Sequence, residues 1–164
     1  MNGMAAVQGE DSVELLFERL DDYMNKKGLR STAQRRTIAR VFFTGPNHVS
    51  IEELLAQARR EDPRIGYATV YRTLKLFTEC GIAEERNFGD GPSRYELSDE
   101  SNEHHHDHMI CVECGVISEF HNAEIERIQA GIAATHGFRV DSHKHEIYGA
   151  CAACQRGSKN RRAN

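Results

Sequence analysis

Hydrophobic side chains recur every three or four positions along the first half of the chain, and this spacing is typical of amphipathic helices. Segment 12–27 places Val13, Leu16 and Leu20 on one face and is followed by Gly28, a common helix stop. The same spacing continues through three more segments, which turn residues separate. We therefore expect three further helices, over residues 32–43, 50–61 and 68–79.

Capping residues set the expected boundaries of the second and third helices. Thr32 can accept a hydrogen bond from the backbone of the next turn, and Gly45-Pro46 stops the helix that follows. Ser50 and Glu53 form the S-x-x-E pattern of a capping box. The third helix is expected to end at Asp62-Pro63.

After residue 81 the helical spacing gives way to short runs typical of strands. Segments 82–86 and 94–97 flank the glycine-rich sequence 87–92, which predicts a hairpin turn. Three helices followed by a helix that leads into a hairpin is the layout of a winged helix-turn-helix. We therefore expect an α+β protein with an N-terminal winged-helix DNA-binding domain at residues 1–97.

Residues 98–164 are expected to form a small C-terminal α/β dimerisation domain with metal sites. The polar, acidic segment 98–103 is typical of a linker, and the polar, basic tail 156–164 is expected to be disordered. Few large apolar side chains lie between them, so this domain should need metal, a partner chain or both for stability. Its expected elements are strands at 105–111, 116–120 and 138–148 and a helix at 123–135.

Charge changes this picture only locally, because the net charge of −4 excludes an overall basic field. Between Met24 and Ser50 six basic residues occur with no Asp or Glu, which suits a phosphate backbone and equally suits an ordinary solvated helix face. These residues are Lys26, Lys27, Arg30, Arg35, Arg36 and Arg40.

The location of the protein decides how its cysteines are interpreted. No apolar run approaches the ~20 residues that cross a bilayer, and the first residues lack the features of a signal peptide, so we expect a cytoplasmic protein. In that reducing compartment five cysteines favour metal binding over disulfides. The pairs Cys111/Cys114 and Cys151/Cys154 are two C-x-x-C motifs, which predict a closed tetrahedral thiolate site for structural Zn²⁺.

The fourth helix is the candidate recognition helix. An apolar face at Val70, Leu74 and Phe77 should pack inward. Arginine on the other side can bind guanine, and the N-terminal residues of a recognition helix contact base edges. A generic amphipathic helix would show the same pattern. The polar side carries Thr69, Tyr71, Arg72 and Lys75.

A histidine-rich run at 104–108 can supply two metal sites, because side chains on a strand alternate between its faces. His104, His106 and His108 would then point one way, and His105 and Asp107 the other. A surface chelating patch or a solvated linker would be simpler explanations. Spacing alone does not assign the remaining ligand-type residues, which are His48, Glu96, Glu119, Glu126, His143 and His145.

Two other classes of protein fit these features less well. A zinc enzyme would need a motif such as H-E-x-x-H, but His145-Glu146 is followed by Ile147-Tyr148-Gly149. The H-x-E and P-C-x-x-C signature of a deaminase does not occur either. A metal-storage or metal-delivery protein would explain the ligands but not the winged helix. We therefore expect a regulator and not an enzyme.

In four segments the chain closely resembles the ferric uptake regulator family. They are Lys27–Arg36, Gly66–Leu74, His104–Gly115 and Cys151–Cys154, and in combination they are very specific. The resemblance implies a homodimeric, metal-dependent repressor that binds double-stranded DNA, with an A/T-rich inverted repeat as its operator and tetramer formation left open.

The resemblance also implies roles for individual residues. It assigns the four cysteines of the C-x-x-C motifs to structural zinc. It places His48, Glu96, His106, His108 and Glu119 in a regulatory site. It places His105, Asp107, Glu126 and His143 in a further site of the dimerisation domain. Lys27 matches a minor-groove lysine, and Tyr71 and Arg72 match major-groove contacts; His104, His145 and Cys80 match no role, and Cys80 is interpreted as a small core residue.

The regulatory ligands are all nitrogen and oxygen, which suit Fe²⁺ and Mn²⁺ and also accept Zn²⁺. Zinc-sensing relatives often place a thiolate in this site, and peroxide-sensing relatives favour Asp where this chain has Glu96 and Glu119. We therefore expect an Fe²⁺-responsive repressor of iron uptake genes. A zinc-responsive or a peroxide- or manganese-responsive member of the same family is the alternative.

Overall fold

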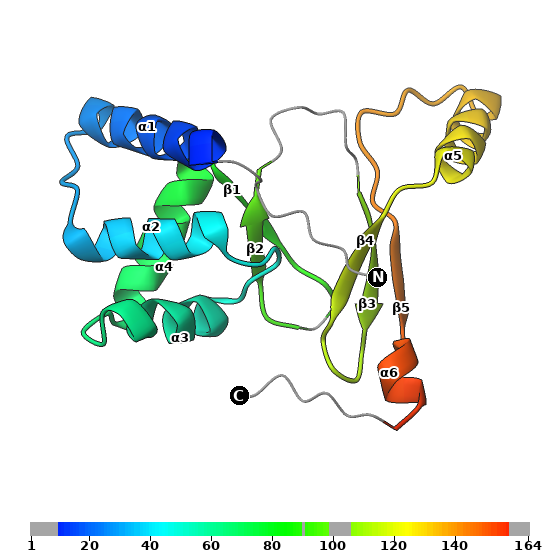
Figure 1. Cartoon of the computed structure of the whole chain (residues 1–164). Coiled ribbons are helices and arrows are strands. Elements are labelled where there is room, and N and C mark those ends of the chain that lie inside the picture. Colours follow the sequence, from blue (N-terminus) through cyan, green and yellow to red (C-terminus); the bar gives the residue numbers. More distant parts are fainter. Residues whose placement is uncertain (1–9, 90, 99–105, 158–164) are drawn as a thin grey trace. The chain divides into compact units, whose positions relative to one another are not determined.

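The computed structural model describes residues 10–89, 91–98 and 106–157 (Figure 1). The chain divides into two compact units, unit 1 at residues 1–99 and unit 2 at residues 100–164. Each unit combines helices with a small sheet, which confirms the α+β class. His104, His105, most of the expected linker and the tail beyond residue 157 lie outside the described residues. None of the described helices is long and apolar enough to cross a membrane.

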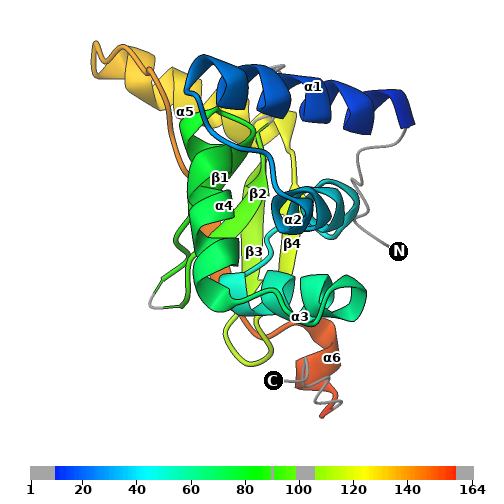
Figure 2. The same cartoon turned by 90° about the vertical axis from the view of Figure 1, so that its left-hand side faces the viewer.

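Unit 1 contains the four expected helices and the expected hairpin. Helices α2 and α3 contact each other and α4, and α4 runs beside the hairpin (Figure 2). The two strands pair antiparallel, from Ala83 opposite Leu97 to Arg86 opposite Arg94. The elements are α1 (Glu10–Lys26), α2 (Ala33–Thr44), α3 (Ile51–Glu61), α4 (Tyr67–Glu79), β1 (Ala83–Arg86) and β2 (Arg94–Leu97).

The expected helix caps are confirmed. The side chain of Thr32 accepts a hydrogen bond from the backbone of Arg35 at 3.2 Å. Ser50 and Glu53 each accept a hydrogen bond from the other's backbone N–H, which completes the capping box of α3. At the end of α2 a Cβ on Gly45 would lie 2.5 Å from the carbonyl oxygen of Val41, so this turn requires glycine.

The core of unit 1 is built around aromatic rings from three helices. Phe43 packs edge-on against Phe17, with ring centroids 5.1 Å apart, and Phe42 stacks on Phe77 at 5.5 Å. Seventeen buried hydrophobic residues of the described chain join this cluster, all of them in unit 1. One contiguous cluster of this kind identifies the hydrophobic core of a domain.

Unit 2 is a three-stranded sheet in the order β4-β3-β5, with one long helix and one short one. Strand β3 pairs antiparallel with β4 and parallel with β5. In its described part the buried hydrophobic side chains are Ile110, Cys111 and Cys154. The elements are β3 (Asp107–Cys111), β4 (Ile117–Phe120), α5 (Ala123–Thr135), β5 (Glu146–Gly149) and α6 (Ala152–Gln155).

The prediction of a strand over residues 138–148 was wrong for most of its length. Only the end of that segment pairs with β3, beginning where Glu146 lies beside His108. A strand extends only as far as its partner, and β3 begins at Asp107 in the described chain. Phe138 is 71% exposed, so alternating hydrophobicity in this segment does not mark a buried face.

Candidate metal centres and DNA-facing helix

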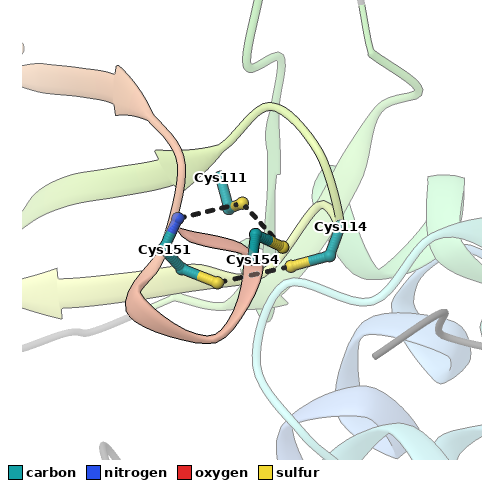
Figure 3. A group of neighbouring side chains, drawn as sticks. All are labelled: Cys111, Cys114, Cys151 and Cys154. Carbon is teal, nitrogen blue, oxygen red and sulfur yellow. Dashed lines mark hydrogen bonds between the residues drawn. The ribbon is translucent and has the colours of Figure 1, made fainter. Parts of the chain in front are cut away.

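The four cysteines of the two C-x-x-C motifs converge on one point (Figure 3). Cys111 is the last residue of β3 and Cys114 lies in the turn that follows, while Cys151 directly precedes α6 and Cys154 lies within it. The sulfur of Cys111 is 3.8 Å from that of Cys154, and the sulfur of Cys114 is 3.8 Å from that of Cys151. Zn–S bonds of about 2.3 Å in a tetrahedron would place sulfurs about 3.8 Å apart, so the spacing fits a zinc ion.

Backbone groups favour the thiolate form of Cys111, whereas burial and the neighbouring sulfurs raise the pKa of Cys154. The backbone N–H of Cys151 donates to the sulfur of Cys111 at 3.2 Å. This bond, together with one from the backbone of Cys114, lowers the pKa of the Cys111 thiol to about 6. Thiolate is the form that binds metal, so the fold prepares at least one ligand. Motif spacing did not reveal that Cys151 directly precedes a short helix, where its backbone N–H points toward Cys111.

Cys80 has a different environment. It ends α4, packs half-buried against the core of unit 1, and its thiol donates to the carbonyl oxygen of Phe77 at 3.4 Å. Burial raises the pKa of this thiol. Both properties are those of a packing residue.

In unit 1, His48 and Glu96 form a close pair, with 2.7 Å between Nδ1 and a carboxylate oxygen. His48 has a φ of 58°, a left-handed conformation that is uncommon for a residue other than glycine. Its neighbour Val49 exchanges two backbone hydrogen bonds with Tyr95 at 2.9 and 2.8 Å, and Arg94 donates to the carbonyl oxygen of His48 at 3.2 Å. Strand β2 therefore carries one member of the pair and fixes the backbone of the other.

Arg86 donates to the other carboxylate oxygen of Glu96 at 2.7 Å. The spacing of residues along the chain did not predict that Arg86 or Arg94 would lie beside this pair. Burial alone would raise the pKa of Glu96, but the hydrogen bonds from His48 and Arg86 outweigh it and hold that pKa below its usual value. Glu96 is thus kept ionised. A carboxylate oxygen beside an imidazole nitrogen is a donor pair suited to a divalent metal.

On the sheet of unit 2 the ligand-type residues alternate between faces, as the sequence predicted for Asp107 and His108. His108 lies directly opposite Glu119 across β3 and β4, and their ligand atoms are within 4.8 Å of each other. Asp107 is opposite Phe120, on the other face. His106 is exposed and precedes the first residue of β3. His105 lies outside the described residues.

Asp107 belongs to a second group of candidate metal ligands. Ligand atoms of Asp107, Glu126 and His143 lie within 4.8 Å of one another. Glu126 Oε1 is buried and accepts no hydrogen bond from the described residues, and Glu126 Oε2 is 3.4 Å from His143 Nε2. Buried carboxylate and imidazole donors with this spacing fit a divalent metal such as Zn²⁺. His145, to which the sequence assigned no role, lies 3.4 Å from Asp107. Its position two residues after His143 was the one feature of the sequence that could have indicated a place near this group.

The polar side of α4 is open to solvent. Val70, Leu74 and Phe77 are fully buried, as expected for the inward face. Tyr71 is 47% exposed, and Arg72 is exposed with its Nε donating to the carbonyl oxygen of Ala68. Lys75 is exposed and Thr69 is partly exposed. The helix can therefore present these side chains to a groove of DNA.

The basic cluster between Met24 and Ser50 is less free than its sequence indicates. Arg36 pairs with Asp21 at 3.1 Å, and Arg40 pairs with Glu61 at 3.4 Å. Lys27 is exposed at the end of α1, with its ammonium group 5.7 Å from the ring centre of Tyr23. Acidic residues outside this stretch thus neutralise part of the cluster.

The comparisons with known proteins agree with these features. The Ferric uptake regulator family model matches residues 26–148. The Ferric uptake regulation protein of Rhizobium leguminosarum bv. viciae is 43% identical over 130 residues, covering 79% of this chain and 89% of the relative. The structure of the Helicobacter pylori ferric uptake regulator, described as revealing three functional metal binding sites, matches at a TM-score of 0.80 and 29% identity, over 93% of this chain and 97% of that chain.

A second solved structure, a zinc-bound manganese uptake regulator, matches at a TM-score of 0.68 and 42% identity, covering 81% of this chain and 98% of that one. The family model spans more than half of the chain, and the relatives are matched over most of their length. The protein therefore belongs to the Ferric uptake regulator family, whose members are transcriptional regulators.

Proposed function

We propose that this protein is a metal-dependent, DNA-binding transcriptional repressor that responds to Fe²⁺ in the cytoplasm. One observation carries the proposal: each unit holds its own pair of nitrogen and oxygen ligands. Unit 1 carries the recognition helix and the pair His48 and Glu96. Unit 2 carries the pair His108 and Glu119.

The proposed regulatory site combines these two pairs with His106. A metal bound by ligands from both units would fix the angle between them. The residues of unit 1 are prepared for this role, because β2 holds the backbone beside His48 and Arg86 keeps Glu96 in place. In a dimer, a fixed angle sets the separation of the two α4 helices, and two half-sites of an operator require a definite separation. Metal would thus shift the population toward the DNA-binding form.

A structural Zn²⁺ is proposed for Cys111, Cys114, Cys151 and Cys154. Its support is the 3.8 Å spacing of the sulfurs and the low pKa of Cys111. Four thiolate ligands leave no open position for chemistry, so this site would hold β3 and α6 together.

The regulatory metal is proposed to be Fe²⁺. The ligands are imidazole and carboxylate, without a thiolate, and the curated relative with 43% identity is named for ferric uptake. Mn²⁺ is the second candidate, because a manganese uptake regulator is 42% identical to this chain. Both metals suit the same donors, so only a measurement in which they compete decides between them.

The proposed operator contacts come from unit 1. Thr69, Tyr71 and Arg72 lie in the first turns of α4, where a recognition helix contacts base edges. Arg72 can donate two hydrogen bonds to guanine once it releases the carbonyl oxygen of Ala68. Lys27 would reach the minor groove beside them.

A homodimer is proposed to form through unit 2. In α5, all of whose residues are described, no side chain is buried. Ile128 and Ile132 lie on one face of that helix, at 48% and 56% exposure. Val140 and Ile147 are also exposed nearby in the sequence of the same unit. An apolar surface of this kind marks an interface with another protein chain, and a second copy would cover it on both partners.

DNA binding by the zinc-loaded protein would test the proposal, measured by fluorescence anisotropy with an A/T-rich inverted repeat, without oxygen and at fixed salt. Fe²⁺ should switch on binding at lower concentrations than Mn²⁺ does and at levels expected in a cell, whereas Zn²⁺ should bind the same donors at least as tightly in vitro. His108→Ala should abolish the metal response, whereas His136→Ala, which changes an exposed histidine on the same unit, should leave it intact. A full metal response in His108→Ala would refute the regulatory site.

A further inference from the structure

The carboxylate of Asp107 is 1% exposed, the least exposed charged group among the described residues of unit 2. It lies in a row of side chains that crosses the sheet. Phe120 is its partner on β4, and His145 lies beside it on the other side, one residue before the parallel pairing of β5 begins. A buried acid thus has an imidazole as its lateral neighbour.

Both the backbone and the ring of His145 are fixed in this position. The carbonyl oxygen of His145 accepts a hydrogen bond from the backbone of His108 at 3.1 Å, which ties the residue to β3. Its ring packs edge-on against Phe120, with centroids 5.7 Å apart. The Nδ1 atom is buried, donates to none of the described residues, and faces Asp107 Oδ2 at 3.4 Å. That distance is a few tenths of an ångström longer than a full hydrogen bond.

His145 is not placed as a metal ligand itself. The group whose ligand atoms lie within 4.8 Å of one another comprises Asp107, Glu126 and His143, and does not include His145. A carboxylate that binds metal through one oxygen leaves its second oxygen buried, and this oxygen needs a hydrogen-bond donor to fix the direction of the first. His145 Nδ1 is the neighbouring nitrogen on the Oδ2 side.

We propose that His145 is a positioning residue, whose Nδ1–H donates to Asp107 Oδ2 and holds the other oxygen of Asp107 toward a divalent metal shared with Glu126 and His143. The inference rests on the proposed metal site of unit 2. It assigns a role to a histidine for which neither the motifs nor the family resemblance supplied one.

Co²⁺ is the probe, because its visible absorption reports the ligands as well as binding. The full-length protein is titrated with Co²⁺ while zinc stays on the cysteines, in a His108→Ala background that removes the other proposed site. Four further variants are compared: His145→Leu, His145→Asn, His143→Ala and the exposed-site control His136→Leu. Asn keeps an N–H donor close to the place of Nδ1, and Leu does not.

His145→Leu should weaken Co²⁺ binding by about 10-fold or more, as loss of a group that orients a ligand does elsewhere. His145→Asn should restore most of the affinity with an unchanged spectrum, and His136→Leu should match the parent. Parental affinity in His145→Leu would overturn the inference, as would an Asn variant as weak as Leu with an altered spectrum, since that marks a direct ligand. If His143→Ala also binds like the parent, the proposed metal site itself fails.

Discussion

The two units of this protein are stabilised in different ways. Unit 1 buries seventeen hydrophobic residues in one cluster, centred on the rings of Phe42, Phe43 and Phe77. The buried hydrophobic residues in the described part of unit 2 are Ile110 and two cysteines, and its long helix α5 buries none of its side chains. The strongest organising feature of unit 2 is instead the cluster of four sulfurs.

This difference separates two kinds of stability. Burial of apolar surface stabilises unit 1 by itself, at roughly 25 cal/mol for each Å² removed from water. Unit 2 has few such contacts, so its folding should depend on metal bonds and on the partner chain. The comparison predicts that one unit can be damaged while the other persists.

The largest effect is expected from loss of the zinc site. Cys111→Ser removes the ligand whose thiolate the backbone stabilises, and structural zinc sites contribute on the order of 10 kcal/mol to folding. Unit 2 should unfold while unit 1 remains folded. Limited proteolysis and zinc content would show this, with Cys80→Ser as the control that keeps both units intact. Cooperative loss of both units would show that they do not fold independently.

Phe77→Ala is expected to have the next largest effect, on unit 1. Phe77 is fully buried and packs against Phe42 and Phe43. Its truncation should lower the free energy of unfolding of unit 1 by about 3–5 kcal/mol. Urea denaturation, monitored by the helical circular dichroism signal, would measure the loss of stability. The zinc content of unit 2 should stay at its parental value, and a fall in zinc content would show that the two units fold together.

A smaller effect is expected at the exposed face of α5. Ile132→Glu should weaken the proposed dimer by on the order of 2–4 kcal/mol, because a charge would replace an apolar contact at the interface. Sedimentation at several concentrations would detect the monomer. Ala134→Glu, a change on an exposed position away from Ile128 and Ile132, should remain dimeric. If both variants stay dimeric, the partner chain binds elsewhere.

The smallest effect concerns alkaline pH and Tyr95 in unit 1. Burial raises the pKa of Tyr95 from 10.0 to about 12, so the unfolded chain loses this proton before the folded one does. Stability that is fully present below pH 10 is therefore lost progressively as the pH rises through 12, and the loss should reach about 1 kcal/mol at pH 11. The difference between the urea midpoints at pH 8 and pH 11 should be smaller in Tyr95→Phe than in the parent. The exposed Tyr71→Phe should behave like the parent.

The sequence allowed most of unit 1 to be predicted, because its signals are local. The helix caps at Thr32 and Ser50 each fall within a single turn, and the apolar face of α4 repeats within about two turns. The segment 138–145 could not be assigned in the same way. Whether it forms a strand depends on the length of β3, which is not local information.

The residues of the candidate metal sites also divide into those predicted from local spacing and those placed by contacts between strands. Two C-x-x-C motifs predict a four-cysteine cluster whatever the loop between them does, and alternation along β3 separates Asp107 from His108. Arg86, Arg94 and His145 were not predicted as part of any site. Each of these residues is brought to its contact by the pairing of neighbouring strands. The register of that pairing, and not the spacing along the chain, therefore sets its role.

The left-handed backbone of His48 has a consequence for protein engineering. A non-glycine residue in that region costs about 1–2 kcal/mol, which Gly28 and Gly81 avoid at their own positive φ angles. A redesign that optimises thermal stability alone would choose glycine or asparagine at position 48. The product would keep a well-folded winged helix but would lose the imidazole beside Glu96, and with it the metal response proposed for this pair.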